Sequence, residues 1–188
     1  ELDRLSSETD PAGLVTKYTY DADGRPATTV DPAGSTTVVS YHSLGQQSAT
    51  SVEPTDPSDP SPARTTTNTY DGEGRLLTST DPTGAVTTYG YDAFGRQYET
   101  IDARGGTNTT TYTPAGRAET VTDAAGRVTT NDYDGNGNLQ QVTGPALPSD
   151  PTPPVTKYTY YDDGHVHTKT DPAGLVTTYT YDPSGRVA

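Results

Sequence analysis

The sequence predicts an all-β protein in which tandem antiparallel β-hairpins stack into a spiralling, β-solenoid-like sheet. Two motifs that recur in fixed phase carry this prediction. The first is Tyr-Asp-x-x-Gly-Arg, whose leading tyrosines lie at positions 20, 41, 70, 91, 112, 133, 160 and 181, so that five of the seven steps are 21 residues. The second is Asp-Pro-x-Gly, which falls between successive tyrosines. Similarity at a fixed period is the signature of a repeat protein.

The Tyr-Asp motif predicts a tight turn at one end of each hairpin. Asp side chains bond to backbone groups two residues on, and glycine accepts the left-handed conformation that such turns need. The best copies are Tyr20–Arg25, Tyr70–Arg75, Tyr91–Arg96 and Tyr181–Arg186, and weaker copies begin at Tyr41, Tyr112, Tyr133 and Tyr160.

The Asp-Pro-x-Gly motif predicts a type I turn at the other end, because Asp, Pro and Gly are preferred at its first, second and fourth positions. Intact copies begin at Asp10, Asp31, Asp81 and Asp171, and degenerate copies begin at Asp102 and Asp123. The runs between turns are rich in Thr, Tyr and Val, which favour strands. Eight two-stranded units give roughly sixteen strands, and an open sheet of that size curls, splits or closes.

The whole chain, residues 1–188, reads as a single array of about eight copies. Pro-rich insertions at 53–63 and 144–154 replace two Asp-Pro-x-Gly turns, and we expect extended, semi-rigid loops there. Arg4 fills the last position of an incomplete first copy, and Ala188 lies within the last copy. We therefore expect a piece of a longer array, whose unpaired sheet edges invite edge-to-edge self-association.

The composition points away from an ordinary globular core. Leu, Ile, Val and Phe make up only 24 of 188 residues, and the net charge is -13, values that are typical of disordered chains. Repeats argue for order instead, because each unit buries surface against its neighbours. The 14 tyrosines combine an apolar body with a polar tip, which suits a wall one sheet thick.

Composition also excludes several functional classes. The acidic balance argues against a nucleic-acid partner, which needs clustered Lys and Arg. No stretch is long and apolar enough for membrane insertion or for a signal peptide within the chain. There is no Cys, which excludes disulfides and thiol chemistry and is compatible with secretion. We found no Ser-His-Asp spacing, no P-loop and no dinucleotide fingerprint.

Candidate metal ligands have simpler explanations. The run that starts at Asp134 begins like an EF-hand loop, but Leu139 and Pro145 stand where Gly and Glu are required. Capping of turns by Asp side chains explains this run and the other acidic turns better. His165 and His167 lack a third ligand, which favours ordinary exposed strand histidines. We therefore predict no metal, no cofactor and no catalytic residue.

Two recurring side chains suggest contacts between repeats. The arginines are expected to pair with Asp or Glu on adjacent strands, or to stack on Tyr rings. They lie at Arg25, Arg75, Arg96, Arg117 and Arg186. Rows of Tyr, such as those at Tyr89 and Tyr179, could instead form a stacking platform for sugars. The alternative function is therefore carbohydrate binding or cell-surface adhesion, with glycans as partners.

The paired motifs resemble the YD repeats of the Rhs family, from about Arg4 to Arg186. This family includes the C components of Tc insecticidal toxins, wall-associated bacterial toxins and the animal teneurins. The resemblance implies β-hairpins wound into a hollow shell, which in the toxin members encloses a C-terminal toxic domain. It implies a non-catalytic structural segment that is secreted or on the cell surface of a bacterium. The expected partners are the rest of the array and an encapsulated toxin domain outside this chain.

Some Rhs shells release their toxin by an aspartyl autoprotease reaction, whose motif resembles Pro-x-x-x-x-Asp-Pro-x-Gly-Leu. The segments that begin at Asp10 and Asp171 match its second half. However, Leu5 and Val166 stand where the first Pro is required. Both segments are also in phase with ordinary repeats. We therefore interpret them as turns and expect no enzymatic activity.

Overall fold

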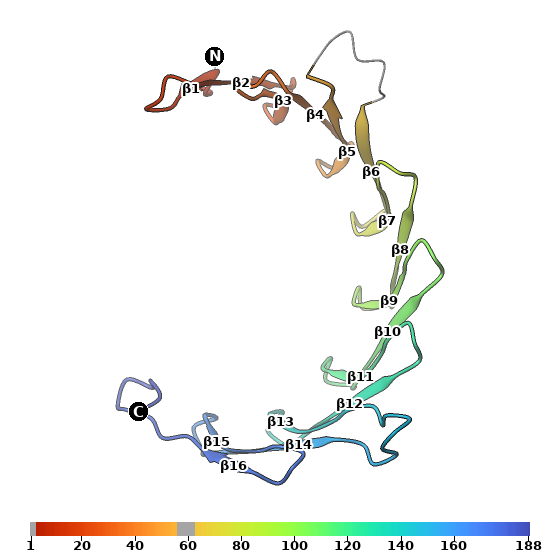
Figure 1. Cartoon of the computed structure of the whole chain (residues 1–188), viewed down its shortest axis with the longest axis vertical. Coiled ribbons are helices and arrows are strands. Elements are labelled where there is room, and N and C mark those ends of the chain that lie inside the picture. Colours follow the sequence, from red (N-terminus) through yellow and green to blue (C-terminus); the bar gives the residue numbers. More distant parts are fainter. Residues whose placement is uncertain (1–2, 56–62) are drawn as a thin grey trace. The chain divides into compact units, whose positions relative to one another are not determined.

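The computed structural model describes residues 3–55 and 63–188 and consists of strands joined by tight turns. Sixteen strands follow one another in a sheet in chain order. Within each of the runs β1–β8 and β9–β16, consecutive strands pair antiparallel as hairpins (Figure 1). The predicted all-β array of hairpins is confirmed, including the expected number of strands.

The chain divides into two compact units, Glu1–Tyr89 and Gly90–Ala188. Strands of the first unit, the last of which crosses the boundary, are β1 (Ser7–Thr9), β2 (Val15–Tyr20), β3 (Pro26–Val30), β4 (Thr36–Tyr41), β5 (Gln47–Glu53), β6 (Arg64–Tyr70), β7 (Leu76–Thr80) and β8 (Val86–Tyr91). Strands of the second unit are β9 (Gln97–Ile101), β10 (Thr107–Tyr112), β11 (Ala118–Thr122), β12 (Val128–Tyr133), β13 (Leu139–Thr143), β14 (Val155–Tyr160), β15 (Val166–Thr170) and β16 (Val176–Thr178). No helix in the described parts of the chain could span a membrane.

Both kinds of turn use the same backbone design. In the turn after β2, the N–H of Gly24 donates to the carbonyl of Asp21, and Gly24 has a φ of 84°. This is a type I turn followed by a left-handed glycine, a common connection for a three-residue hairpin loop. Fourteen described glycines have positive φ, and no described residue of another type does. The fixed positions of glycine in the two motifs therefore follow from backbone geometry.

The strands carry little apolar packing. No described residue is fully buried, so the sheet has no closed hydrophobic core. Polar cross-strand pairs join neighbouring strands instead, as between the hydroxyl oxygens of Thr19 and Thr28, which lie 2.6 Å apart. The same pair recurs at Thr69–Thr78, Thr111–Thr120 and Thr159–Thr168. Within each unit, backbone ladders and such pairs connect the strands.

The insertion between β13 and β14 closes into a small hairpin of its own. Leu147 and Asp150 exchange two backbone hydrogen bonds of 3.0 Å each, and Asp150 Oδ1 accepts from the N–H of Thr152 at 2.9 Å. This differs from the extended loop expected from proline content, because Pro148 and Ser149 occupy the middle of a tight turn. The other insertion, at 53–63, was also expected to form an extended loop. Its residues 56–62 lie outside the described residues, and so does this prediction.

Candidate functional site

One aspartate oxygen organises most of the turns. In the turn that follows β8, Asp92 Oδ1 accepts hydrogen bonds from the N–H of Phe94 at 2.9 Å and of Arg96 at 3.0 Å. The same pair of bonds, each of 2.8–3.0 Å, forms at Asp10, Asp21, Asp31, Asp71, Asp81, Asp92, Asp102, Asp123, Asp134, Asp171 and Asp182. Asp therefore performs the same capping task in both motifs.

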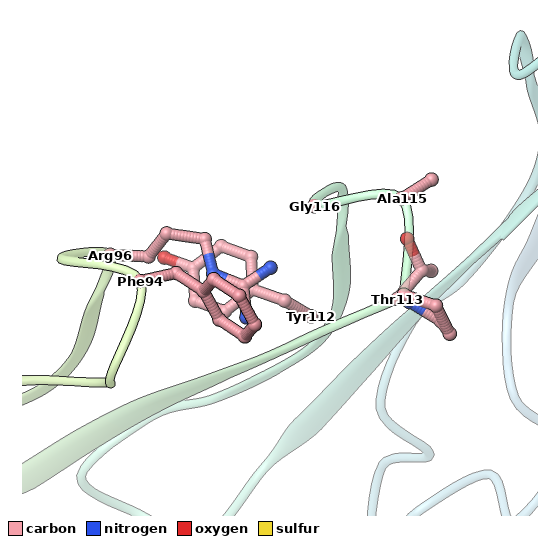
Figure 2. A pocket seen from close by; sticks show the side chains of 7 residues that line it. Phe94, Arg96, Tyr112, Thr113, Ala115 and Gly116 are labelled. Carbon is pink, nitrogen blue, oxygen red and sulfur yellow. The ribbon is translucent and has the colours of Figure 1, made fainter.

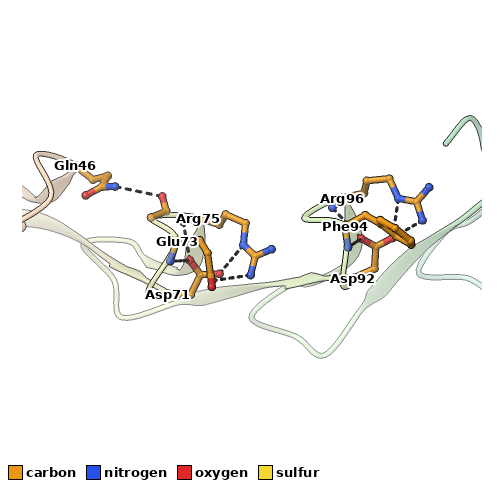
Figure 3. A network of polar contacts seen from close by, with 8 residues as sticks. Gln46, Asp71, Glu73, Arg75, Asp92, Phe94 and Arg96 are labelled. Atoms are coloured by element: carbon orange, nitrogen blue, oxygen red, sulfur yellow. Dashed lines mark hydrogen bonds and ion pairs between the residues drawn. The ribbon is translucent and has the colours of Figure 1, made fainter.

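The other aspartate oxygen holds the arginine of the same turn. Asp92 Oδ2 accepts from Arg96 Nε at 2.7 Å and lies 2.6 Å from its Nη2 (Figure 3). Equivalent Nε–Oδ2 bonds of 2.6–2.8 Å occur at Asp21–Arg25, Asp71–Arg75 and Asp182–Arg186. Each of these arginines therefore forms its ion pair with the aspartate four residues earlier in the chain, on the other side of the same turn. This arrangement leaves the flat face of the guanidinium free to stack.

Arginine then reaches the next repeat. The guanidinium carbon of Arg25 lies 4.5 Å from the ring centre of Tyr41, and that of Arg96 lies 4.4 Å from the ring centre of Tyr112. Arg4 and Arg117 stack on Tyr20 and Tyr133 at 5.4 and 5.7 Å. These are cation–π distances. The arginine of one turn therefore joins its own aspartate to the leading tyrosine of the following repeat.

The tyrosine hydroxyl completes the contact between repeats. Tyr41 OH donates to the carbonyl of Pro26 at 2.8 Å, and Pro26 directly follows Arg25. The same bond, at 2.5–3.0 Å, is made by Tyr20, Tyr41, Tyr70, Tyr112, Tyr133, Tyr160 and Tyr181. We call this set (the Asp and Arg of one turn with the Tyr of the next) the inter-repeat latch. The Tyr, Asp, Gly and Arg of the first motif therefore all take part either in the inter-repeat latch or in the turn that carries it.

The latch favours ionised aspartates. The pKa of Asp92 lies below its usual value, chiefly because Asp92 accepts a hydrogen bond from the Arg96 guanidinium. Hydrogen bonds from backbone N–H groups lower this pKa further, whereas partial burial raises it. For Asp21 and Asp71 partial burial is the largest influence and favours the protonated acid. The combined hydrogen bonds from Arg25 and Arg75 outweigh it, and the pKa of each Asp is lowered.

One copy replaces the arginine of the latch by histidine. His165 Nδ1 lies 3.1 Å from Asp163 Oδ1, and the His165 ring lies 4.7 Å from the ring of Tyr181. The His167 ring stacks at 4.4 Å on Tyr161 instead. Both histidines are half-buried, which corrects the prediction of ordinary exposed strand histidines. No group of three or more His, Asp or Glu among the described residues is arranged to hold a metal ion.

The remaining sequence candidates fall into ordinary positions. Asp134 Oδ1 caps its turn, and Asp134 Oδ2 accepts from the side chain of Asn138 at 3.0 Å. Asp10 and Asp171 cap turns in the same way, as interpreted from their phase. Tyr89 in β8 and Tyr179, which follows directly after β16, are half-buried rather than exposed as platforms.

A pocket of about 550 Å³ lies beside one latch and was not predicted. Its lining comprises Phe94, Arg96, Tyr112 and the turn 113–116 (Figure 2). Phe94 occupies a turn position that is acidic in three other copies, at Asp23, Glu73 and Asp163, and it is 84% exposed. Arg96 stacks on its ring at 5.0 Å. The sequence feature that could have indicated this pocket is the single Phe of the chain, which stands at a turn position.

Comparison with known proteins agrees with the repeat pattern. A family model described as RHS Repeat matches residues 1–36, 70–107 and 155–188. No match was found among the curated proteins.

Among solved structures, the chain is similar to TcdB2-TccC3 (21% identity, TM-score 0.71) and to TcdB2-TccC3 without its hypervariable C-terminal region (20%, 0.72). It is also similar to the Photorhabdus luminescens Tc holotoxin pore (20%, 0.73). Each alignment covers 93% of this chain and 10% of the other, so the chain spans about a tenth of their length. At such identity the likeness shows the fold.

Proposed function

Because this chain belongs to the RHS repeat family, whose model matches more than half of it, we propose that it forms part of the wall of a shell that encloses a polypeptide. Its role is structural and non-catalytic. The enclosed polypeptide is a toxin domain or another cargo that lies outside this chain, and the shell acts in secretion or at the surface of a bacterium.

The main support is the thinness of the sheet. No described residue is fully buried, so the protein is built as a layer rather than around a core. A single layer has two solvated faces, and its polar composition allows both to stay in water. Such a layer separates two volumes while it uses few apolar residues. A wall has this requirement, whereas an enzyme active site needs a concave, water-excluding pocket.

The inter-repeat latch supports the same proposal. A wall must not open between neighbouring hairpins, and backbone ladders alone leave a thin sheet easy to distort. The latch adds a stacking contact and a hydroxyl bond from one repeat to the next, as between Arg25 and Tyr41. The acidic net charge of -13 keeps the wall soluble. No specific observation favours the alternative of sugar binding at Tyr89 or Tyr179.

Limited proteolysis of the complete gene product that contains this chain tests the proposal. If the repeats enclose a cargo, the cargo expressed within the whole protein is cleaved far more slowly than the same segment expressed alone. Mild acid or denaturant that opens the repeats should remove this protection. Equal cleavage rates in both settings would contradict enclosure. An unrelated repeat protein fused to the same cargo controls for simple steric shielding.

A further inference from the structure

The contact between the turn at Asp134 and the repeat that begins at Tyr160 departs from the inter-repeat latch. The arginine position of this copy is Asn138. The rest of the latch is in place, because Asp134 Oδ1 caps its turn and Tyr160 OH donates to the carbonyl of Leu139 at 2.7 Å. The acid and the ring therefore keep their usual positions, while a shorter, neutral side chain replaces the guanidinium that joins them in other copies.

Asn138 reproduces only one of the bonds that an arginine makes. Its Nδ2 donates to Asp134 Oδ2 at 3.0 Å, as Arg96 Nε donates to Asp92 Oδ2 at 2.7 Å. Arg96 adds a second contact to the same oxygen through Nη2 at 2.6 Å, and it places a flat cation 4.4 Å from the ring centre of the next tyrosine. Asn138 supplies neither. Asp134 Oδ2 therefore keeps acceptor capacity, and no described residue stacks a cation on the Tyr160 ring.

The acid, the amide and the ring border one pocket. Its volume is about 250 Å³, and Asp134, Asn138, Tyr160 and Asp162 are among the residues that line it. The pocket lies between two successive turns, as does the larger pocket in which Arg96 takes the place that Asn138 has here. The short side chain at position 138 thus leaves room beside the tyrosine ring, where other copies hold a guanidinium.

The pocket is acidic. Asp134 and Asp162 line it and no Lys or Arg does, and neither aspartate forms an ion pair with any residue that the structure describes. Lys157 lies on the opposite face of β14 from Tyr160, because side chains alternate along a strand. Arg117 approaches the turn from the preceding repeat, where its guanidinium stacks on a different tyrosine. A cation in the pocket would therefore meet two carboxylates that lack a counter-charge.

A guanidinium matches these groups better than a compact cation or a neutral ligand does. It is flat, so it can lie on the Tyr160 ring, and it carries several N–H donors, so it can bond to Asp134 Oδ2 at the same time. The chain itself makes this pairing at Arg25 and Arg96. A neutral sugar would leave both carboxylates without a positive partner. We propose that this pocket binds a guanidinium group of another molecule, either a small guanidinium compound or an arginine side chain of a polypeptide.

Nuclear magnetic resonance of the ¹⁵N-labelled chain tests this site with N-acetyl-arginine amide as the probe, at constant ionic strength. We expect shifts at the Asn138 side-chain amide and at the Asp162 N–H, with a Kd of about 1–10 mM for so small a ligand. N-acetyl-citrulline amide has a similar shape without the charge and should bind at least about tenfold more weakly. N-acetyl-lysine amide has the charge without the flat group and should bind about threefold more weakly.

Two results of this titration would overturn the proposal. One is the absence of shifts at the Asn138 side-chain amide and the Asp162 N–H up to about 50 mM of the arginine probe. The other is tighter binding of methyl glucoside than of the arginine probe at the same two groups, which would identify a sugar site instead.

Two variants separate loss of the site from loss of the fold. Asn138→Arg should fill the pocket with the chain's own guanidinium, so that probe binding weakens at least about tenfold while the melting temperature rises. The Asp162 side chain makes no hydrogen bond to any described residue, so Asp162→Asn should keep the turn and weaken binding about threefold. Glu119→Gln removes the same charge from an exposed position of β11 outside the pocket and is the matched control. Unchanged binding in both pocket variants contradicts the site.

The source of the guanidinium is decided by a second comparison. Methylguanidinium is compared with a short peptide in which one arginine lies between glycines. Tighter binding of the peptide identifies a polypeptide side chain as the ligand, whereas equal or tighter binding of methylguanidinium identifies a small compound. If the same peptide with citrulline in place of arginine binds as tightly, the charge is not recognised and the proposal is wrong.

Discussion

The guanidinium of Arg117 lies in the space that a Cβ atom on Gly137 would occupy. Gly137 belongs to the next repeat and has a φ of 86°. Glycine is therefore needed there twice, once for its backbone conformation and once for the close approach of the latch. Arg4 lies against Gly24 in the same way. Two constraints thus act together on the glycine of the Tyr-Asp motif.

Gly137→Ala should destabilise the repeats around β12 and β13. The left-handed conformation costs about 1–2 kcal/mol for a residue with a Cβ atom, and Arg117 must also leave its place over Tyr133. Chemical denaturation and hydrogen exchange of the two strands measure the loss. Gly135→Ala is the control, because no described atom lies within 4 Å of its added Cβ and its φ is not positive. Equal effects of the two substitutions would contradict the double role of Gly137.

Removal of one latch hydroxyl should have a local effect. Tyr133→Phe loses the bond to the carbonyl of Ala118, which is 2.8 Å long, at an expected cost of about 1 kcal/mol. Stability in a repeat array depends mainly on nearest neighbours. We therefore expect faster hydrogen exchange in β11 and β12 and little change in β2 and β3. Tyr98→Phe, which alters an exposed side chain, serves as the control. A uniform loss across all strands would argue against a local latch.

Acidification should weaken the repeats. The pKa of Asp92 is lowered on folding, chiefly by the Arg96 guanidinium. A lowered pKa contributes stability above the unfolded-state value of about 3.9, and this contribution is lost as pH falls through the folded-state value. Circular dichroism melts between neutral pH and about pH 2 should show a falling melting temperature below about pH 4. Asp92→Asn should reduce this dependence, whereas a melting temperature that rises on acidification would contradict it.

His165 offers a test of the latch chemistry. A guanidinium stays charged and carries five N–H donors, whereas an imidazole carries at most two. His165→Arg should therefore strengthen the contact with Asp163 and with the Tyr181 ring, and raise the melting temperature of the repeat at pH 7. A gain of the same size in an Asp163→Asn background would show that the ion pair does not contribute.

The period of the motifs was sufficient to predict the fold. The positions of Tyr, Asp, Pro and Gly fixed where each turn lies and therefore the order of the strands. Composition alone pointed to disorder, because apolar counts ignore backbone ladders, capped turns and polar pairs such as Thr19 with Thr28. These polar contacts take the place of a core in a thin sheet.

The contacts between repeats could be predicted only in part. Stacking of Arg on Tyr was expected, but the acceptor of the tyrosine hydroxyl depends on the register of strands that are far apart in sequence. Tyr160 reaches the carbonyl of Leu139, 21 residues earlier, and Tyr41 reaches Pro26, only 15 residues earlier. The pocket was missed because it combines an irregular turn at Thr113 with a ring at Phe94 from another repeat.

The latch and the insertion at 144–154 lie at opposite ends of the strands. Tyr160 keeps its hydroxyl bond to Leu139 although this insertion lengthens the chain between them. The Asp-Pro-x-Gly end can therefore grow or change without disturbing the contact that fixes one repeat to the next. Natural variation should accumulate at this end, and foreign peptides should be tolerated there when they are grafted between Gly144 and Pro154. The fold thus offers one margin that holds the repeats together and one that is open to diversification.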